Sequence, residues 1–547
     1  MTRKKLLSLA LALCMVFTLM IPSLGLAGAV SLEGKLVILH TNDVHGRGVG
    51  STTAWGYGAI AQVKKDLEAQ GALVLLLDAG DASQGTPLVN LDQGKTAIDF
   101  MNAAGYDAMC PGNHEFDWGY DNLQQILENA SFPVLAANIV DSVSGEGKFE
   151  AYTIIEKGDY KIGVFGLDTP ETMTKAHPDK VRGINFLQGE ELYACAQAQV
   201  DALTEAGCDL IVCLGHLGVA DESIGNQSYD VIANTTGIDL FIDGHSHTAF
   251  ETGKSVSNAG EEKTLLVSTG EYCENIGVVV YDGEKLSADL FACSTAAAAI
   301  TGADEEVASI VTARNDAVEA ELSAVFAKTE IDLNGERAPG VRTEETNLGD
   351  FAADAILWSA QQAVGDHVVA AITNGGGIRA SIPAGDVTMK DMKTVFPFGN
   401  EVSVLTVTGA ELLEALEAAT HSTPDAIGAF PQVAGIVFSI DTTVPYEQGE
   451  QYPDSTYFAP KNPGARVTIE TVGGEAFDPE ALYTIATNDF TAAGGDTYYA
   501  FKYANATTGY KTGVALEDAL VNYVTSVLDG IIGGDYAQPQ GRITVIQ

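Results

Sequence analysis

Acidic and imidazole side chains gather in five short motifs in the first half of the 547-residue chain. These motifs hold five of the nine histidines, and four of the five motifs follow a short apolar run. Imidazole and carboxylate ligands together suit zinc, manganese, cobalt or iron. The candidate ligands are Asp43 and His45 in TNDVHG, Asp81 in LDAGD, Asn113 in PGNHEFDWG, His216 in LGHLG, and His245 and His247 in DGHSH.

The number of candidate ligands indicates two metal ions. A single ion would leave several ligands without a role, whereas two ions bridged by one carboxylate use the whole set. Asp43 and His45 are two residues apart, so in an extended backbone their side chains face the same way. One such motif alone is more often structural, but the complete set is typical of a dinuclear centre that clamps a phosphoryl group during in-line attack.

The apolar runs predict the scaffold that positions these motifs. Short buried strands of an α/β sandwich are expected, with the motifs at the strand ends, where open α/β sheets generally hold ligands. A single long helix is expected over 303–326, and the remaining chain is long enough for a core of its own. The expected strands cover 36–39, 73–77, 162–165, 210–214 and 240–242; the helix pattern uses Val307, Ile310, Val311, Val318, Leu322 and Phe326.

Charge and composition narrow the classes of partner. The chain has 29 basic and 74 acidic residues, a formal charge of -45, and 46% hydrophobic residues. Such an acidic surface repels nucleic-acid polymers and anionic membranes, so neither is an expected partner. A small phosphate substrate would therefore need a locally positive pocket.

The N-terminus has the pattern of a secretory signal peptide. Three basic residues at 3–5 precede an apolar run over 6–21, and Ala27-Gly28-Ala29 fits small-residue cleavage. We expect cleavage after residue 29, with an uncleaved anchor as the alternative. No later stretch approaches the about 18 apolar residues that a span requires. Six cysteines remain after residue 29, so disulfides are compatible with export, but their pairing is not readable.

TNDVHG, GD, GNHEFDWG, GHLG and GHSH resemble the signature blocks of the calcineurin-like metallophosphoesterases, specifically their 5'-nucleotidase branch. The resemblance covers nearly the whole chain after the signal peptide. It implies one metal ion on Asp43, His45 and His247, another on Asn113, His216 and His245, and Asp81 bridging the two. It also implies a catalytic pair, in which His114 stabilises developing charge or protonates the leaving oxygen and Asp117 orients it.

The second half of the chain resembles the nucleotide-recognition domain of the same family through VRTEETNLGD, TNGGGIRASI, FPFGN and NDFTAAGGDTY. By that resemblance the phosphates contact arginine, whose planar fork gives bidentate, permanently charged hydrogen bonds. Two aromatic rings would stack on the base, which tolerates different bases. The implied contacts are Arg342, Arg379 and Asn374 for phosphate, Phe398 and Phe490 for the base, and Asp496 for polar groups of the sugar or base.

Together these features predict a four-layered α/β-β/α metallophosphoesterase sandwich at 30–302, a linker helix and connection at 303–340, and an α+β substrate-recognition domain at 341–547. By resemblance, domain rotation about the linker gates the substrate cleft. The expected protein is a secreted 5'-nucleotidase that uses two divalent ions, zinc, manganese or cobalt, to direct water at the terminal phosphorus in line. It would act in nucleotide catabolism in the periplasm, at the cell surface or outside the cell.

Other activities remain open at this point. Nucleoside di- and triphosphates and UDP-sugars are further candidate substrates. The nearest alternative is a 2',3'-cyclic-nucleotide phosphodiesterase and 3'-nucleotidase of the same architecture. A nucleotide-binding surface protein without catalysis is the alternative from another class, although retention of every ligand and of His114 argues against it.

Overall fold

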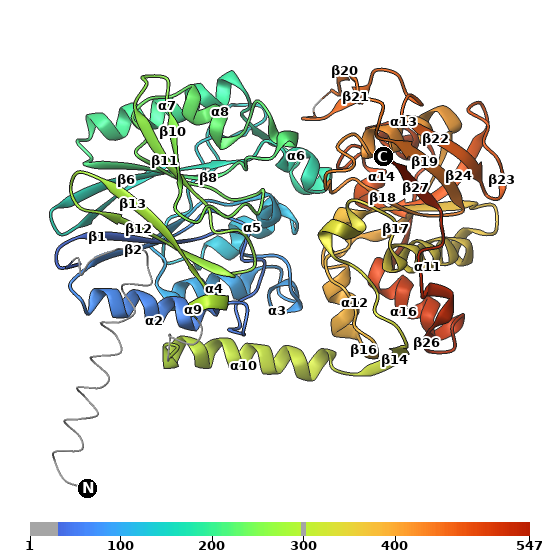
Figure 1. The fold of residues 1–547 in the computed structure, drawn as a ribbon, viewed down its shortest axis with the longest axis horizontal. Helices are drawn as coiled ribbons and strands as arrows, with labels where there is room; N and C mark the ends of the chain where they lie inside the picture. Colours follow the sequence, from blue (N-terminus) through green and yellow to red (C-terminus); the bar gives the residue numbers. More distant parts are fainter. Residues whose placement is uncertain (1–30, 297–301, 454) are drawn as a thin grey trace, which may run out of the picture.

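A computed structural model describes residues 31–296, 302–453 and 455–547. Two domains lie side by side, and helix α10 (Glu305–Leu322) runs below the N-terminal domain toward the C-terminal domain (Figure 1). The predicted signal peptide, residues 1–29, lies outside the described residues. In the described ranges, no helix is long and apolar enough to cross a membrane, and the six cysteines form no disulfide.

The first sheet of the N-terminal domain has five strands. β1, β2 and β3 are parallel neighbours, whereas β12 and β13 are antiparallel. Their order is β13 (Leu286–Ala292), β12 (Asn275–Tyr281), β1 (Leu36–Thr41), β2 (Leu73–Asp78) and β3 (Ala108–Met109).

The second sheet has six strands. Parallel pairing joins β6, β8, β9 and β11, so their carboxyl ends meet at one edge. The order is β10 (Lys254–Ser257), β11 (Lys263–Val267), β9 (Leu240–Ile242), β8 (Leu210–His216), β6 (Tyr160–Asp168) and β5 (Tyr152–Lys157).

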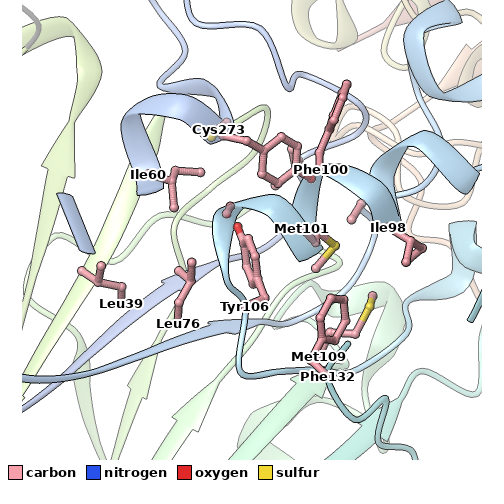
Figure 2. Packing of buried hydrophobic residues seen from close by; sticks show 14 of the residues in the cluster. Leu39, Ile60, Leu76, Ile98, Phe100, Met101, Tyr106, Met109, Phe132 and Cys273 are labelled. Atoms are coloured by element: carbon pink, nitrogen blue, oxygen red, sulfur yellow. The ribbon is translucent and has the colours of Figure 1, made fainter. Parts of the chain in front are cut away.

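The two sheets pack face to face around side chains of both, such as Leu75 from β2 and Val212 from β8. Helices α2 (Gly56–Glu68), α4 (Lys95–Ala104) and α5 (Tyr120–Leu127) cover the outer face of the first sheet. Figure 2 shows this layer, in which Ile60, Ile98 and Phe100 of the helices belong to the same buried cluster as Leu39 and Leu76 of the strands. Helices α7 (Glu190–Glu205) and α8 (Ser228–Ala233) cover the outer face of the second sheet. The predicted four-layered sandwich is confirmed.

All five apolar runs predicted as buried strands lie in strands, namely β1, β2, β6, β8 and β9. Their side chains are buried because each sheet has another layer on both faces. The short elements of this domain are α3 (Pro87–Asn90), β4 (Ile139–Asp141), α6 (Thr172–Lys175), β7 (Ile184–Phe186), α9 (Cys293–Ala296) and the 3-10 turns Asn113–Phe116, Pro178–Lys180 and Asp221–Ser223.

The C-terminal domain is built on a five-stranded mixed sheet. Helices α11 (Asn347–Val364) and α16 (Leu516–Ser526) form a core with one face, and α13 (Gly409–Ala419) and α15 (Tyr499–Thr508) form a core with the other. The strand order is β18 (Pro431–Ala434), β15 (Ala370–Asn374), β24 (Leu482–Asn488), β17 (Glu401–Thr408) and β25 (Tyr510–Ala515).

Smaller sheets surround this core. A four-stranded sheet holds β23 (Glu475–Ala476), β22 (Val467–Val472), β19 (Ile436–Asp441) and β27 (Ile543–Ile546), and a two-stranded arm holds β20 (Gln448–Gln451) and β21 (Phe458–Pro460). A three-stranded sheet holds β16 (Gly385–Thr388), β14 (Val325–Thr329) and β26 (Ile531–Ile532); the short helices are α12 (Met389–Val395) and α14 (Asp489–Ala492).

The linker helix ends earlier than the sequence predicts. α10 begins after Asp304, whose carboxylate accepts a hydrogen bond from the backbone N–H of Val307, and it ends at Leu322 instead of continuing to residue 326. Phe326 lies in β14, which pairs with β16 and β26 of the C-terminal domain. Ile310 was expected on the apolar face but is 42% exposed. Strand pairing outweighs the helical pattern over the last residues.

Candidate active site

The predicted metal ligands converge at the carboxyl ends of the parallel strands. Loops after β1, β2, β3 and β9 carry most of them, and His216 is the last residue of β8. Both sheets contribute, so the cluster lies where the edges of the two sheets meet. The ligands are buried: Asp43, His45, Asp81, Asn113 and His216 are each at most 3% exposed.

Asp43, His45 and His247 surround one point. The Nε2 atoms of His45 and His247 are 3.3 Å apart, and Oδ1 of Asp43 is 3.3 Å from Nε2 of His247. Two ligand atoms bound to one tetrahedral zinc ion at 2.0–2.1 Å would lie about 3.3 Å apart. The spacing of these three side chains therefore fits a divalent ion.

Asp81, Asn113, His216 and His245 form the adjoining group. Nε2 of His216 lies 3.1 Å from Oδ2 of Asp81, and Nδ1 of His245 lies 2.8 Å from Oδ1 of Asn113. The buried Nε2 of His216 has no well-directed hydrogen bond to any described residue. A metal ion bound between Nε2 of His216 and the Asp81 carboxylate would account for their short separation and for the missing hydrogen bond. This group therefore also fits a metal ion.

The outward nitrogens of two imidazoles contact backbone carbonyls. Nδ1 of His45 lies 3.2 Å from the carbonyl oxygen of Gln84, and Nδ1 of His216 lies 2.6 Å from that of Ala79. A carbonyl accepts only from an N–H, so each contact fixes the proton on Nδ1 and leaves Nε2 as the ligand atom.

The backbone around the cluster is strained. Positive φ values occur at Asp43 (50°), His45 (47°), Asp81 (60°), His245 (73°) and His247 (55°). A non-glycine residue rarely adopts this region, and such residues concentrate at functional sites. The expectation of an extended backbone through Asp43 and His45 was wrong, because β1 ends at Thr41 and the chain turns sharply to aim both side chains at the cluster.

Two glycines in the motifs allow the backbone to approach the ligand side chains closely. A Cβ on Gly112 would lie 2.4 Å from Oδ1 of Asp81, and one on Gly244 would lie 2.7 Å from Nδ1 of His216. Both distances are too short for a side chain. Glycine at these positions therefore lets the loops after β3 and β9 close over the buried ligands.

His114 and Asp117 form a hydrogen-bonded pair beside the cluster. Nδ1 of His114 is 2.7 Å from Oδ2 of Asp117, and the backbone N–H of His114 donates to Oδ1 of Asp81 at 2.9 Å. The rings of His114 and His45 lie 5.2 Å apart. Burial raises the pKa of Asp117, although the neighbouring imidazole opposes that shift.

Burial and neighbouring charges shift the pKa values of two buried imidazoles in opposite directions. Burial lowers the pKa of His45 well below its usual value, and Arg379 adds to that effect while Asp81 opposes it. Burial also acts to lower the pKa of His216, but the charges of Asp81 and Asp43 outweigh it and raise that pKa well above its usual value. A metal ion that binds at this nitrogen would therefore displace a proton from His216.

A single pocket between the two domains brings the remaining predictions together. It is lined by all the predicted site residues except Asp43, His45 and His216, which lie buried behind it. The C-terminal domain contributes Arg342, Asn374, Arg379, Phe398, Phe490 and Asp496 to its lining.

Three arginines gather on the C-terminal side of this pocket. Arg337 was not predicted, but it lines the pocket together with Arg342 and Arg379. Burial lowers the pKa of Arg342, and the charges of Arg337 and Arg379 lower it further. The cluster is thus a locally positive region in an acidic chain, and an anion would relieve its mutual repulsion.

The two predicted base-stacking rings differ in their surroundings. The ring of Phe398 is nearly parallel to the imidazole of His114, with centroids 5.5 Å apart and planes at 20°, and the guanidinium of Arg379 lies 5.7 Å from the Phe398 ring centre. Phe490 packs on Gly495, where a Cβ would approach the ring to 2.3 Å. Phe398 therefore packs against His114 of the predicted catalytic pair and also lines the pocket.

Comparison with known proteins adds independent information. The Calcineurin-like phosphoesterase family matches residues 36–249, and the 5'-nucleotidase, C-terminal domain family matches residues 325–503. The 5'-nucleotidase of Vibrio cholerae is 31% identical over 506 residues, which cover 85% of this chain and 86% of that protein. The chain belongs to the 5'-nucleotidase family.

Two further proteins align over most of this chain. The crystal structure of a 5'-nucleotidase precursor from Thermus thermophilus superposes with a TM-score of 0.78 at 29% identity, covering 94% of this chain and 99% of that one. The trifunctional nucleotide phosphoesterase protein YfkN of Bacillus subtilis is 32% identical over 86% of this chain, which spans only 32% of that longer protein. The predicted family is confirmed, and the N-terminal half of this family member is a metallophosphoesterase domain with clustered Asp and His side chains.

Sequence reasoning missed several residues of this 5'-nucleotidase family site. Glu115 is 1% exposed and accepts hydrogen bonds from the backbone N–H groups of Asp81, Ala82, Ser83 and Gly112. It thereby joins the loops after β2 and β3.

Glu171 and Glu271 also contact the histidines of the cluster. Each follows the carboxyl end of a parallel strand, β6 and β11, by a few residues. An acid just after an apolar run is the signal that could have found them.

Lys175, His177 and Asn400 line the pocket as well. The Lys175 side chain lies 3.7 Å from the Asp496 carboxylate, and the backbone N–H of Asp496 donates to the carbonyl of Thr174 at 2.9 Å. These contacts join α6 of the N-terminal domain to Asp496 of the C-terminal domain. No local sequence pattern predicts them.

Proposed function

We propose that this chain is an exported, metal-dependent 5'-nucleotidase that hydrolyses nucleoside 5'-phosphates to nucleoside and phosphate. One observation carries the proposal: a single pocket is lined on one side by Asp81 and His247, which belong to the Asp and His clusters that fit metal ions, and on the other by three arginines and two phenylalanines. A substrate that fills it needs an anionic group and a flat apolar group on one molecule. A nucleotide has both.

The metal ligands in this proposal are those that the family resemblance implies. Asp43, His45 and His247 would hold one ion, Asn113, His216 and His245 would hold the other, and Asp81 lies between the two groups. When bound, divalent ions in such a centre supply a nucleophile at neutral pH and stabilise charge on a transferring phosphoryl group.

The arginines bind the phosphate from the opposite side. Arg342 and Arg379 present planar donors to its oxygens, and the neighbouring Arg337 adds positive charge. Asn374 holds Asp496 through a 2.9 Å hydrogen bond from its amide to the carboxylate. That contact prepares Asp496 to accept hydrogen bonds from ribose hydroxyls or base amino groups.

His114 acts on the leaving oxygen. Its Nδ1 is bonded to Asp117, so Nε2 is the ring nitrogen available to the substrate. Protonated Nε2 donates to the oxygen that leaves phosphorus, and the Asp117 carboxylate stabilises the imidazolium and fixes its orientation. Phe398 and Phe490 hold the base by stacking.

Hydrolysis by the purified chain without residues 1–29 tests the activity. Free phosphate is measured and the nucleotide products are separated by chromatography, because opening a cyclic phosphate or cleaving a UDP-sugar into UMP and a sugar phosphate frees no inorganic phosphate. AMP, ATP, a UDP-sugar and 2',3'-cyclic AMP are the substrates, with and without manganese or zinc. The cyclic substrate is included because the trifunctional relative from Bacillus subtilis is a nucleotide phosphoesterase by name. Asp81→Asn is the matched control, since it keeps the shape of the side chain and removes its charge.

Metal-dependent release from AMP that disappears in Asp81→Asn is the expected result. Activity mainly on the cyclic or sugar substrate would contradict the 5'-nucleotidase assignment but keep the phosphohydrolase class. Bound metal without turnover of any substrate would favour a binding protein. Export is tested separately by N-terminal sequencing of the protein recovered outside the cytoplasm, where the expected first residue is Val30.

A further inference from the structure

Both histidines of the GHSH motif contact a carboxylate through one ring nitrogen. Nε2 of His245 lies 3.1 Å from Oε2 of Glu171, and Nδ1 of His247 is hydrogen-bonded to Glu271. In each ring the other nitrogen faces the cluster: Nδ1 of His245 lies 2.8 Å from Oδ1 of Asn113, and Nε2 of His247 lies 3.3 Å from Nε2 of His45. The carboxylates are thus on the far side of each imidazole.

The two rings contact their carboxylates through different nitrogens, and this difference determines which nitrogen of each ring carries the proton. A carboxylate accepts a hydrogen bond from a ring nitrogen that carries a proton. Glu171 therefore fixes the proton of His245 on Nε2, and Glu271 fixes that of His247 on Nδ1. The free lone pair is then on Nδ1 in His245 and on Nε2 in His247. Without such partners either ring could take the other tautomer and present an N–H to the cluster.

Glu271 lies on a strained segment that encloses one group of ligands. It is followed by Tyr272 and Cys273, whose φ values are 58° and 59°. The backbone N–H of Tyr272 donates to the carbonyl of Asp43 at 2.7 Å, and the Tyr272 ring lies 6.0 Å from that of His247. The segment therefore fixes the position of the carboxylate relative to the ligands.

Glu171 is almost fully buried, with 1% exposure. Taking a carboxylate out of water is costly unless it is paired and hydrogen-bonded. Its partners include His245 and Lys175, whose Nζ is 3.9 Å from Oε2 of Glu171. A buried acid held against the outer nitrogen of a candidate ligand is the arrangement that orients metal-binding histidines in other proteins.

We propose that Glu171 and Glu271 are positioning residues of the metal centre, each holding one imidazole of the GHSH motif in the tautomer and orientation that a metal ion requires. One carboxylate serves each ion: Glu271 acts on the group of Asp43 and His45, and Glu171 acts on the group of Asn113 and His216. This inference rests on the metal centre of the proposed function and is independent of which nucleotide is hydrolysed.

Metal affinity of the full chain is the first test. Competition with a chelator measures how tightly zinc and manganese bind to the unchanged chain and to four variants. The variants are Glu271→Gln, Glu271→Met, Glu171→Gln and Glu171→Met. Loss of an outer partner typically costs 10-fold to 100-fold in metal affinity. We expect that loss for one of two ions in each variant, smaller with Gln, which still accepts a hydrogen bond, and larger with Met, which does not. Glu274→Gln, on the same segment as Glu271, is the control and should bind both ions normally.

Lys175→Met removes the ion pair between Lys175 and Glu171 but leaves the contact between Glu171 and His245 in place. If Lys175→Met weakens metal binding as much as Glu171→Met does, the ion pair would explain the loss and the positioning role of Glu171 would be wrong. Thermal unfolding of each variant without metal checks that the fold is retained.

Histidine tautomers give a second test that needs no change at either glutamate. Nitrogen-15 spectra of histidine-labelled, zinc-loaded protein distinguish Nδ1–H from Nε2–H imidazoles, and His245→Gln and His247→Gln assign the two signals. We expect Nε2–H for His245 and Nδ1–H for His247. The reverse tautomers would overturn the proposal.

The two proposals fail in different ways. If the unchanged chain binds no metal ion, the proposed function and this inference both fail. If it binds two ions and the Gln and Met variants bind them equally well, only the positioning role fails. Turnover of a different substrate would affect only the proposed function.

Discussion

His40 gives the N-terminal domain a pH-dependent stability that can be calculated. It lies in β1, is 1% exposed and packs against Gly277 of β12, where a Cβ would approach Nε2 to 2.0 Å. Its Nδ1 has no hydrogen-bond partner among the described residues. Burial lowers the pKa of His40 from 6.5 to about 3. The folded protein therefore keeps this imidazole neutral at pH values where the unfolded chain protonates it.

The sign and size of the effect follow from proton linkage. Above pH 6.5 the His40 imidazole is neutral in both the folded and the unfolded state and does not change the free energy of unfolding. As the pH falls below 6.5, only the unfolded state gains a proton at His40, so the free energy of unfolding decreases until about pH 3. Each pH unit in that window costs about 1.4 kcal/mol. Between pH 7 and pH 5 the loss from His40 is therefore about 2 kcal/mol.

His40→Gln removes this titration while keeping a polar side chain of similar size. Urea unfolding of the wild type and the variant is measured at pH 7 and pH 5 with excess chelator, so that metal loss affects both equally. The variant should lose about 2 kcal/mol less than the wild type between the two pH values, whatever the substitution costs at pH 7. His367→Gln, at an exposed position, is the control. Equal losses in the wild type and His40→Gln would refute the reasoning.

Four further predictions concern the site. Asp117→Asn should lower kcat by roughly 10²-fold to 10⁴-fold with metal content unchanged, because the imidazole loses its charged partner; a normal kcat would exclude the catalytic pair. Glu115→Gln should lower the free energy of unfolding by about 2 to 5 kcal/mol, because its amide would face two buried backbone N–H groups; urea unfolding within 1 kcal/mol of wild type would contradict this. Phe490→Ala should raise KM for AMP about 10-fold or more, whereas Phe398→Ala should also lower kcat, because that ring contacts the catalytic imidazole; unchanged KM in both would exclude stacking. Zinc binding at pH 6.5 should release protons, because acidic neighbours raise the pKa of His216 despite its burial; calorimetry in buffers of different ionisation enthalpy measures the release, and identical enthalpies would disprove it.

The sequence alone determined the features that depend on local patterns. Buried strands such as β2 and β8 appear as short apolar runs because both faces of each sheet are covered. Polar ligands follow those runs because the carboxyl ends of parallel strands meet at one edge. The motifs that carry Asp43 or His216 are short and contiguous, so the family and the candidate ligands could be predicted from them.

Only the tertiary structure decided the features that join distant segments or depend on strand pairing. Glu171 and His245 are 74 positions apart, and Phe398 meets His114 across the two domains. No periodicity relates such positions, because their contact depends on how sheets and domains pack. The positive φ at Asp43 and the end of α10 at Leu322 likewise reflect tertiary constraints. Packing and strand pairing in those places outweigh the local preference of the backbone, and local preference is all that a sequence pattern reports.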